Sequence, residues 1–224
     1  MIMDPDTDKA ARRSAKLQSL FALAQIVPVI TIEDAAHAVP LARALTRGGL
    51  RAVEITLRTP AALDAAKAIR AEVPEAIVGI GTVLTPEDLE RSAAIGAAYA
   101  LSPGATPELL EAARANELPF IPGVQTASEL IACVTRGFEI VKFFPAVPAG
   151  GLAAIRALAG PFPSVRFCPT GGIGENDARD WLAEPNVVAV GGSWITPRVD
   201  IQAGAWDKIE TRARAAAQLS GKQV

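Results

Sequence analysis

The chain has 224 residues, of which 50% are hydrophobic and 5% aromatic, so it can bury a sizeable core built mainly from Ala, Val, Leu and Ile. A formal net charge of -2 provides no electrostatic support for a nucleic-acid partner or an anionic membrane. No apolar run is long enough to cross a bilayer, the first residues lack the apolar core of a signal peptide, and two cysteines cannot form a disulfide framework. We therefore expect a cytoplasmic protein.

The chain opens with a polar segment that favours a helix, at about residues 8–24. Its apolar residues recur with helical spacing and form one stripe: Leu17, Leu20, Phe21 and Leu23. We expect an extra N-terminal helix that caps a larger body. Residues 1–25 are thus predicted to be a lead with a capping helix, and residues 26–224 a single domain.

A regular alternation follows this lead, in which short β-branched runs are separated by alanine-rich amphipathic segments. The predicted strands are 27–32, 52–57, 77–81, 99–102, 120–124, 140–144, 165–168 and 187–190. The predicted helices are 34–46, 60–72, 86–95, 106–115, 126–136, 149–158, 175–182 and 206–219. Such an alternation predicts parallel strands that are joined by crossover helices.

Eight near-equal units fit a (β/α)8 or TIM barrel better than a doubly wound open sheet, which commonly has fewer strands and a reversal in their order. Several predicted helix starts carry a threonine cap before a proline: Thr59-Pro60, Thr85-Pro86 and Thr106-Pro107. Glycines lie where helices should end: Gly48-Gly49, Gly96 and Gly137. These local signals agree with the global pattern and favour the barrel.

One lysine, Lys142, lies within the apolar strand-like segment Gly137-Phe-Glu-Ile-Val-Lys-Phe-Phe-Pro145. Burial of an ammonium group is costly, so Lys142 either reaches solvent or is kept partly neutral, in which form an amine attacks a carbonyl and forms a Schiff base. Glu54 is similarly placed in strand 52–57 and shares a face with Thr56 and Arg58. Glu54 and Arg58 either pair with helices outside the barrel or project into its mouth, where barrel enzymes carry their chemistry.

Glycine-rich turns lie at the last two predicted strand ends. Thr170-Gly171-Gly172 leads toward a helix near Glu175, and Gly191-Gly192-Ser193 follows the last strand. Tight turns alone explain such glycines, but these turns also direct backbone N–H groups at phosphate oxygens. Because barrels frequently bind phosphate at these two loops, the pattern favours a phosphate site.

The sequence does not indicate other catalytic chemistry. The single histidine, His37, lies on the first predicted barrel helix, where we expect a surface or packing role, and no Cys/His cluster offers zinc ligands. Neither a Ser-His-Asp arrangement nor a glycine motif for nucleotides is present. Cys133 and Cys168 are expected to be small core residues. Covalent catalysis by an amine remains, without a metal or other cofactor.

Two segments resemble the signatures of the 2-keto-3-deoxy-6-phosphogluconate / 4-hydroxy-2-oxoglutarate aldolase family. They are Gly49-Leu-Arg-Ala-Val-Glu-Ile-Thr-Leu-Arg58 and Gly137-Phe-Glu-Ile-Val-Lys-Phe-Phe-Pro-Ala146. Further similar stretches lie at 27–30, 77–83, 101–104, 166–173 and 191–194. The polar lead before Leu17 lies outside the resemblance. Thr31 stands where some relatives are expected to carry a basic residue, which implies weaker phosphate binding or more reliance on backbone groups.

The resemblance implies a metal-independent class I aldolase, typically a homotrimer, that cleaves a 2-keto acid phosphate into pyruvate and glyceraldehyde 3-phosphate. Lys142 would form the Schiff base, and Glu54 would be the general acid/base. Arg58 and Thr82 would hold the substrate carboxylate. The residues implied in phosphate binding are Thr170, Gly171, Gly172, Gly192 and Ser193. Two alternatives stay open, namely a preference for unphosphorylated 4-hydroxy-2-oxoglutarate and a barrel that only binds a sugar phosphate.

Overall fold

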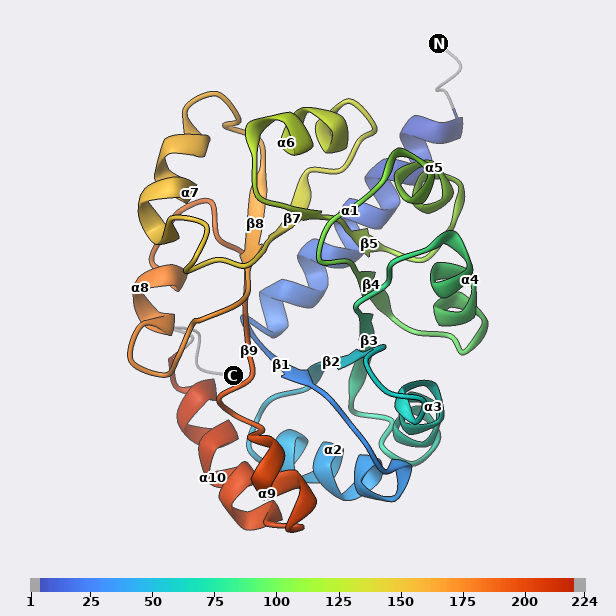
Figure 1. Cartoon of the computed structure of the whole chain (residues 1–224), viewed down its shortest axis with the longest axis vertical. Helices are drawn as coiled ribbons and strands as arrows, with labels where there is room; N and C mark the ends of the chain where they lie inside the picture. Colours follow the sequence, from blue (N-terminus) through green and yellow to red (C-terminus); the bar gives the residue numbers. More distant parts are fainter. Residues whose placement is uncertain (1–4, 220–224) are drawn as a thin grey trace.

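The structure, a computed structural model, describes the backbone of residues 5–219 and the side chains of residues 9–219. It is an α/β fold in which parallel strands form a curled sheet and helices surround the strands (Figure 1). The strands are β1 (Ile26–Ile30), β2 (Ala52–Thr56), β3 (Ile77–Gly81), β4 (Tyr99–Leu101), β5 (Phe120–Ile121), β6 (Gly123–Val124), β7 (Ile140–Phe143), β8 (Arg166–Pro169) and β9 (Val190–Gly192). Residues 1–4 of the predicted lead and residues 220–224 of the predicted domain lie outside the described residues.

The helices alternate with the strands, as the sequence pattern predicts. They are α1 (Pro5–Leu23), η1 (Ala35–His37), α2 (Ala38–Arg47), α3 (Ala62–Glu72), α4 (Pro86–Ala94), α5 (Pro107–Ala115), α6 (Ala127–Val134), α7 (Gly151–Ala159), α8 (Ala178–Leu182), α9 (Arg198–Gln202) and α10 (Trp206–Ala217). The short helix α9 was not predicted. Within the described part of the chain, no helix combines the length and the apolarity that crossing a membrane requires.

The strands pair in two parallel sets. Six of them follow the order β5-β4-β3-β2-β1-β9, and the other three follow the order β6-β7-β8. The predicted strand 120–124 forms as two pieces on either side of Pro122, which has no N–H to donate to a ladder. Single parallel bridges join Phe167 to Val187 and Thr170 to Gly191, so β8 lies beside the chain segment that forms β9.

The prediction of the last strand is wrong in its position. The ladder with β1 forms at Val190–Gly192, where Val27 pairs with Gly191, and not at 187–190. Gly191 and Gly192 therefore belong to the strand and do not follow it. Gly191 also makes a close contact there, because a Cβ atom on Gly191 would overlap the Thr170 hydroxyl.

Two of the three predicted threonine caps form. The Oγ1 atoms of Thr85 and Thr106 accept hydrogen bonds from the N–H groups three residues later, at 3.1 and 3.2 Å. Thr59 does not cap α3, which begins at Ala62, because its hydroxyl donates to the carbonyl oxygen of Ile32 instead. This bond joins the segment after β2 to the segment after β1, and α3 begins two residues later than predicted.

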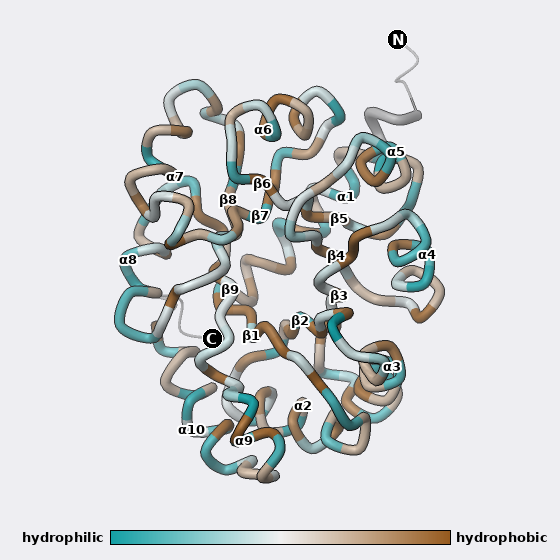
Figure 2. Tube along the Cα trace, viewed as in Figure 1, coloured by the Kyte–Doolittle hydropathy of each residue, from teal (hydrophilic) through white to brown (hydrophobic). Residues whose placement is uncertain are grey.

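Two apolar clusters lie on the two sides of the curled sheet. The larger one fills the space between strands and helices, and the hydropathy of the chain shows apolar residues on the central strands and polar residues on the outer helices (Figure 2). The smaller cluster lies inside the curl and joins α1 to inward side chains of the strands, including Tyr99, Ile140 and Cys168. Leu17, Leu20 and Phe21 are buried there as predicted, whereas Leu23 is 71% exposed and does not belong to the stripe.

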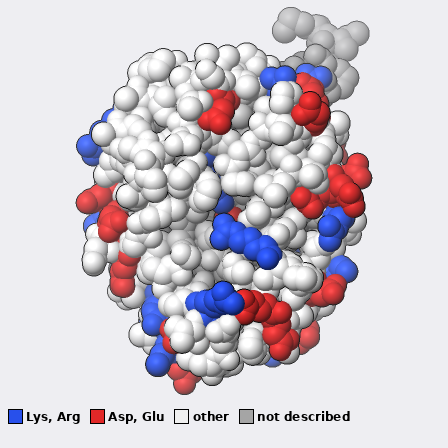
Figure 3. Space-filling model, in the orientation of Figure 1, with Lys and Arg blue, Asp and Glu red and all other residues white. Residues whose placement is uncertain are grey.

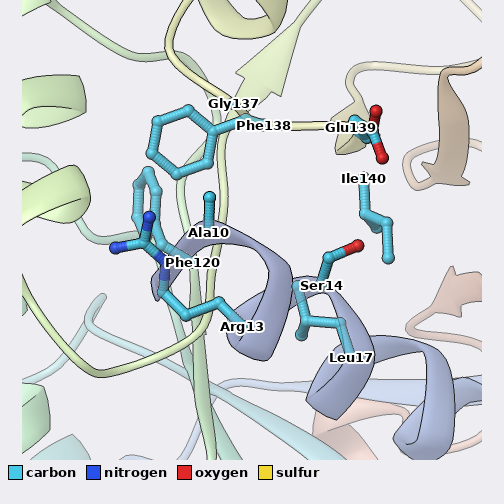
Figure 4. Close-up of a pocket in the computed structure, with 9 residues that line it drawn as sticks. All are labelled: Ala10, Arg13, Ser14, Leu17, Phe120, Gly137, Phe138, Glu139 and Ile140. Carbon is cyan, nitrogen blue, oxygen red and sulfur yellow. The ribbon is translucent and has the colours of Figure 1, made fainter. Parts of the chain in front are cut away.

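Helix α1 is fastened to the carboxyl end of α5 by Arg13, whose side chain is buried. Its Nη1 atom donates to the carbonyl oxygens of Ala113, Arg114 and Asn116 at 2.8, 2.7 and 2.9 Å. The guanidinium lies 5.9 Å from the centroid of the Phe138 ring, at the edge of a small pocket between α1 and the strands (Figure 4). A cation here offsets the partial negative charge of the last carbonyl groups of α5.

We expect Arg13→Met to lower the free energy of unfolding by about 3 kcal/mol, because it removes charge-assisted hydrogen bonds and leaves the carbonyl oxygens of α5 without them. Chemical denaturation monitored by circular dichroism measures this change. The matched control is Lys16→Met on the exposed side of the same helix, which should stay within about 0.5 kcal/mol of the wild type. Equal stability of the two variants would contradict the role of Arg13.

Candidate active site

The two ionisable residues of the central strands meet inside the curled sheet. Lys142 projects from β7 and Glu54 from β2, and the Lys142 Nζ atom donates a hydrogen bond to the Glu54 Oε1 atom at 2.8 Å. Their side chains are 5% and 1% exposed. Both side chains therefore point inward and do not reach the outer helices. A buried charge is tolerated when it is paired, so each residue accounts for the burial of the other.

The strands bring these side chains to the same depth. Lys142 pairs in register with Gly123 on one side and with Cys168 on the other, and Glu54 pairs with Val29 and Gly79. Ala52 and Ile140 lie two residues earlier on the same strands and belong to the inner apolar cluster. The ion pair thus lies one side-chain layer nearer the carboxyl ends of the strands than Ala52 and Ile140.

Two neighbours of Lys142 shape its surroundings. The Lys142 amine lies 5.6 Å from the centroid of the Phe144 ring, within the range of a cation–π interaction. Burial, partly offset by the charge of Lys142, raises the pKa of the Cys168 thiol to about 12. Cys168 therefore stays a neutral thiol at physiological pH.

Several polar side chains lie beyond the ion pair, toward the strand ends. The Thr56 hydroxyl donates to the carbonyl oxygen of Ile30 at 2.9 Å and lies 3.0 Å from the Thr31 hydroxyl. The Ser102 hydroxyl accepts a hydrogen bond from the N–H group of Gly123 at 3.1 Å. Thr56 lies two residues beyond Glu54 on β2 and therefore shares its strand face.

Arg58 and Thr82 follow the neighbouring strands β2 and β3. Arg58 is exposed, and its N–H group donates to the carbonyl oxygen of Thr56 at 2.8 Å in a tight turn. Thr82 is half-buried and has a φ of 60°, in the left-handed region that residues other than glycine rarely adopt. Such backbone strain is concentrated at functional sites. Figure 3 shows a hollow at the centre of the face opposite α1, with basic and acidic side chains at its base.

The predicted phosphate residues lie at the ends of β8 and β9: Thr170, Gly171 and Gly172 follow β8, Gly192 is the last residue of β9, and Ser193 follows it. Thr170 is buried, and its Oγ1 atom has no hydrogen-bond partner within the described part of the chain. Gly171 and Gly172 have φ values of 104° and 83°, which favour glycine. Ser193 is exposed directly after β9. The helix expected at Glu175 begins only at Ala178, so no helix start adjoins these glycines.

The sequence reasoning missed two residues beside Glu54. Gly81 faces the Glu54 carboxylate, and the Tyr99 hydroxyl donates to the carbonyl oxygen of Val53 at 3.0 Å. The available signal was the spacing of Gly79 and Gly81, which places two glycines on one face of β3.

His37 packs against the Trp206 ring at a centroid distance of 5.7 Å, in agreement with a packing role. Among the described residues, no group of three or more His, Cys, Asp and Glu side chains could hold a metal.

Comparisons with known proteins find relatives that match most of the chain. The family model described as KDPG and KHG aldolase matches residues 17–212. The KHG/KDPG aldolase of Escherichia coli K12 is 49% identical over 201 residues, which cover 90% of this chain and 94% of that protein. The 2-dehydro-3-deoxy-phosphogluconate aldolase of Pseudomonas aeruginosa is 43% identical over 205 residues, which cover 92% of this chain and 93% of that protein.

Solved structures show the same likeness. The KDPG aldolase of Legionella pneumophila, with pyruvate captured as a covalent carbinolamine, matches with a TM-score of 0.87 and 43% identity over 89% of this chain and 97% of that one. The 2-keto-3-deoxy-6-phosphogluconate aldolase of Zymomonas mobilis, with 3-phosphoglycerate, matches with a TM-score of 0.85 and 42% identity over 91% of this chain and 96% of that one. From the extent of these matches, the chain belongs to the KDPG and KHG aldolase family.

Proposed function

We propose that this protein is a class I aldolase that cleaves 2-keto-3-deoxy-6-phosphogluconate (KDPG) into pyruvate and glyceraldehyde 3-phosphate through a Schiff base on Lys142. The observation that carries this proposal is the buried hydrogen bond between Lys142 and Glu54. An amine must lose a proton before it attacks a carbonyl carbon, and a carboxylate in direct contact accepts that proton. The relatives named as KDPG aldolases support the same substrate.

In the proposed reaction, the Lys142 amine adds to the C2 keto carbon, and loss of water from the carbinolamine leaves an iminium. Glu54 then takes the proton of the C4 hydroxyl group. The C3–C4 bond breaks, its electron pair moves into the iminium to form an enamine, and glyceraldehyde 3-phosphate departs. Glu54 returns its proton to C3, and hydrolysis by one water releases pyruvate and restores the amine. Each step uses only these two side chains and water.

The substrate ends would be held by the loops at the carboxyl ends of the strands. We assign the 2-keto acid carboxylate to Arg58 and Thr82, since a guanidinium and a hydroxyl group donate to a carboxylate. We assign the phosphate to the loops after β8 and β9. The proposed phosphate residues are Thr170, Gly171, Gly172, Gly192 and Ser193. The unpartnered Thr170 hydroxyl supports this assignment, and the Zymomonas mobilis aldolase structure with 3-phosphoglycerate supports a phosphate-bearing ligand.

We expect Ser193→Ala to raise KM for KDPG roughly tenfold with little change in kcat, because one hydrogen bond to a charged phosphate is lost far from the reacting carbons. Steady-state kinetics that follow pyruvate release measure both constants. The matched control is Ser19→Ala on the exposed face of α1, which should leave KM unchanged. An unchanged KM for Ser193→Ala would remove this residue from the phosphate site.

A second activity has its own support. The relative in Escherichia coli K12 is named a KHG/KDPG aldolase, and Thr31 lacks the charge of the basic residue expected at that position. A preference for unphosphorylated 4-hydroxy-2-oxoglutarate follows if the loops after β8 and β9 contribute little to substrate affinity. The ratio of kcat/KM for the two substrates decides between them, and a higher value for KDPG supports the leading proposal.

We further propose that the strands close into a complete (β/α)8 barrel, with residues 26–224 as one domain and residues 1–25 as a lead and capping helix. The bridges from β8 to Val187 and Gly191 support closure, because they lie between the two sets of strands. A homotrimer in the cytoplasm, with only small-molecule partners, follows from the family resemblance. Light scattering after size-exclusion chromatography tests the trimer, which requires three times the chain mass of 23.3 kDa.

A further inference from the structure

Strand β3 carries two glycines on the face that adjoins Glu54. Gly79 is the register partner of Glu54 itself, and Gly81 is the partner of Thr56. A Cβ atom on Gly81 would overlap the Glu54 Oε1 atom and would lie 2.7 Å from both its Cγ and Cδ atoms. Real Cβ atoms do not approach carboxylate atoms this closely. The Glu54 carboxylate therefore occupies the space that the missing side chain of Gly81 leaves.

Gly79 has a similar relation to Tyr99, its register partner on β4. A Cβ atom on Gly79 would overlap the ring of Tyr99, whose hydroxyl donates to the carbonyl oxygen of Val53, next to Glu54. Burial, and then the charge of Glu54, hold the pKa of Tyr99 well above its usual range, so the hydroxyl stays neutral and keeps its proton for this bond. The two glycines thus admit two side chains, and Gly81 admits the one that contacts Lys142.

The backbone of Gly81 does not itself demand glycine. Gly81 ends β3, and it is absent from the glycines of this chain that have a positive φ. An alanine can adopt extended strand geometry, so substitution at this position acts through the space it fills. The small size of the residue, and not its conformational freedom, is what the site uses.

We propose that Gly81 is a positioning residue that lets the Glu54 carboxylate lie where it accepts the hydrogen bond of Lys142. This inference rests on the proposed roles of Lys142 and Glu54. A methyl group at position 81 turns the carboxylate away from the amine and from the C4 hydroxyl of the substrate. Lys142 still reaches pyruvate, but proton transfer at C3 and at the C4 oxygen loses its carboxylate. Gly81→Ala should therefore reproduce the catalytic defect of Glu54→Gln.

The test is a pair of mutant cycles. Gly81→Ala should lower kcat for KDPG roughly 100-fold, in the range of general acid/base catalysis, while borohydride still traps pyruvate on the protein. Added to Glu54→Gln, the same change should lower kcat by less than about threefold, because the carboxylate is already absent. Retention of wild-type kcat by Gly81→Ala, or a full second loss in the Glu54→Gln background, would overturn the proposal.

Stability gives a readout that remains valid if Gly81→Ala folds poorly. Gly81→Ala should lower the melting temperature of the wild type but not that of Glu54→Ala, in which the overlapping atoms are gone. An equal loss in both backgrounds would place the clash elsewhere and refute the role. Gly160→Ala, where a Cβ atom meets only the Ala157 carbonyl oxygen at 3.8 Å, is the control and should keep wild-type kcat. If borohydride does not trap pyruvate on the wild type, the proposed function is wrong. The melting temperatures would still show whether the Gly81 position makes room for the Glu54 side chain.

Discussion

Lys142→Met should lower kcat/KM for KDPG by about 10,000-fold or more, a loss of about 5.4 kcal/mol of transition-state stabilisation, and should abolish trapping of pyruvate by borohydride. Methionine keeps an apolar stem as long as that of lysine but has no amine. Without an iminium at C2, the electron pair of the breaking C3–C4 bond has no acceptor. A coupled assay for pyruvate measures the rate, and peptide mass spectrometry of the wild type should locate the reduced pyruvate adduct on Lys142.

The same substitution leaves Glu54, which is 1% exposed, without its cation. Loss of one partner of a buried pair costs about 3–5 kcal/mol, so the variant should also be less stable. The double variant Lys142→Met/Glu54→Gln should recover much of this stability and remain inactive, which separates the chemical role from the structural one. Lys67→Met, which changes an exposed lysine on α3, should keep full activity.

Two results would contradict the role of Lys142. One is a pyruvate adduct that persists in Lys142→Met, and the other is an adduct that maps to a different lysine in the wild type. Absence of any adduct in the wild type during turnover would favour the remaining alternative, in which the site binds a sugar phosphate and Lys142 supplies only charge.

Glu54→Gln should lower kcat by about 100- to 10,000-fold, the usual range for loss of a general acid/base, while pyruvate is still trapped on Lys142. The amide oxygen of glutamine still accepts the hydrogen bond from the amine, but it cannot take the proton of the C4 hydroxyl group or return it to C3. The chemical step of cleavage is therefore slowed more than imine formation. Single-turnover rates of imine formation and of pyruvate release measure the two effects separately.

The matched control for this prediction is Glu75→Gln, which changes an exposed glutamate before β3 and should not alter kcat. Full activity of Glu54→Gln would end the assignment of Glu54 as the general acid/base. Equal loss of trapping and turnover would instead indicate that Glu54 acts mainly in activating the Lys142 amine.

The order of elements could be read from the sequence because each strand and helix carries its own local signals. β-branched runs, threonine caps such as Thr85 and Thr106, and glycines at helix ends all act within a few residues. The errors arose where a distant contact overrode these signals. Thr59 bonds to Ile32 in place of capping α3, and β9 forms its ladder with β1 at Val190–Gly192 and not at 187–190.

By itself, the sequence determined that Lys142 and Glu54 lie within apolar strands and that each shares a strand face with defined neighbours, because side chains alternate with a period of two. Only the tertiary structure decided that the two side chains, which lie 88 residues apart, meet at 2.8 Å. Their meeting depends on the register of several strands and on the space left by Gly81. Register and close packing arise between segments distant in the chain, so no local pattern specifies them.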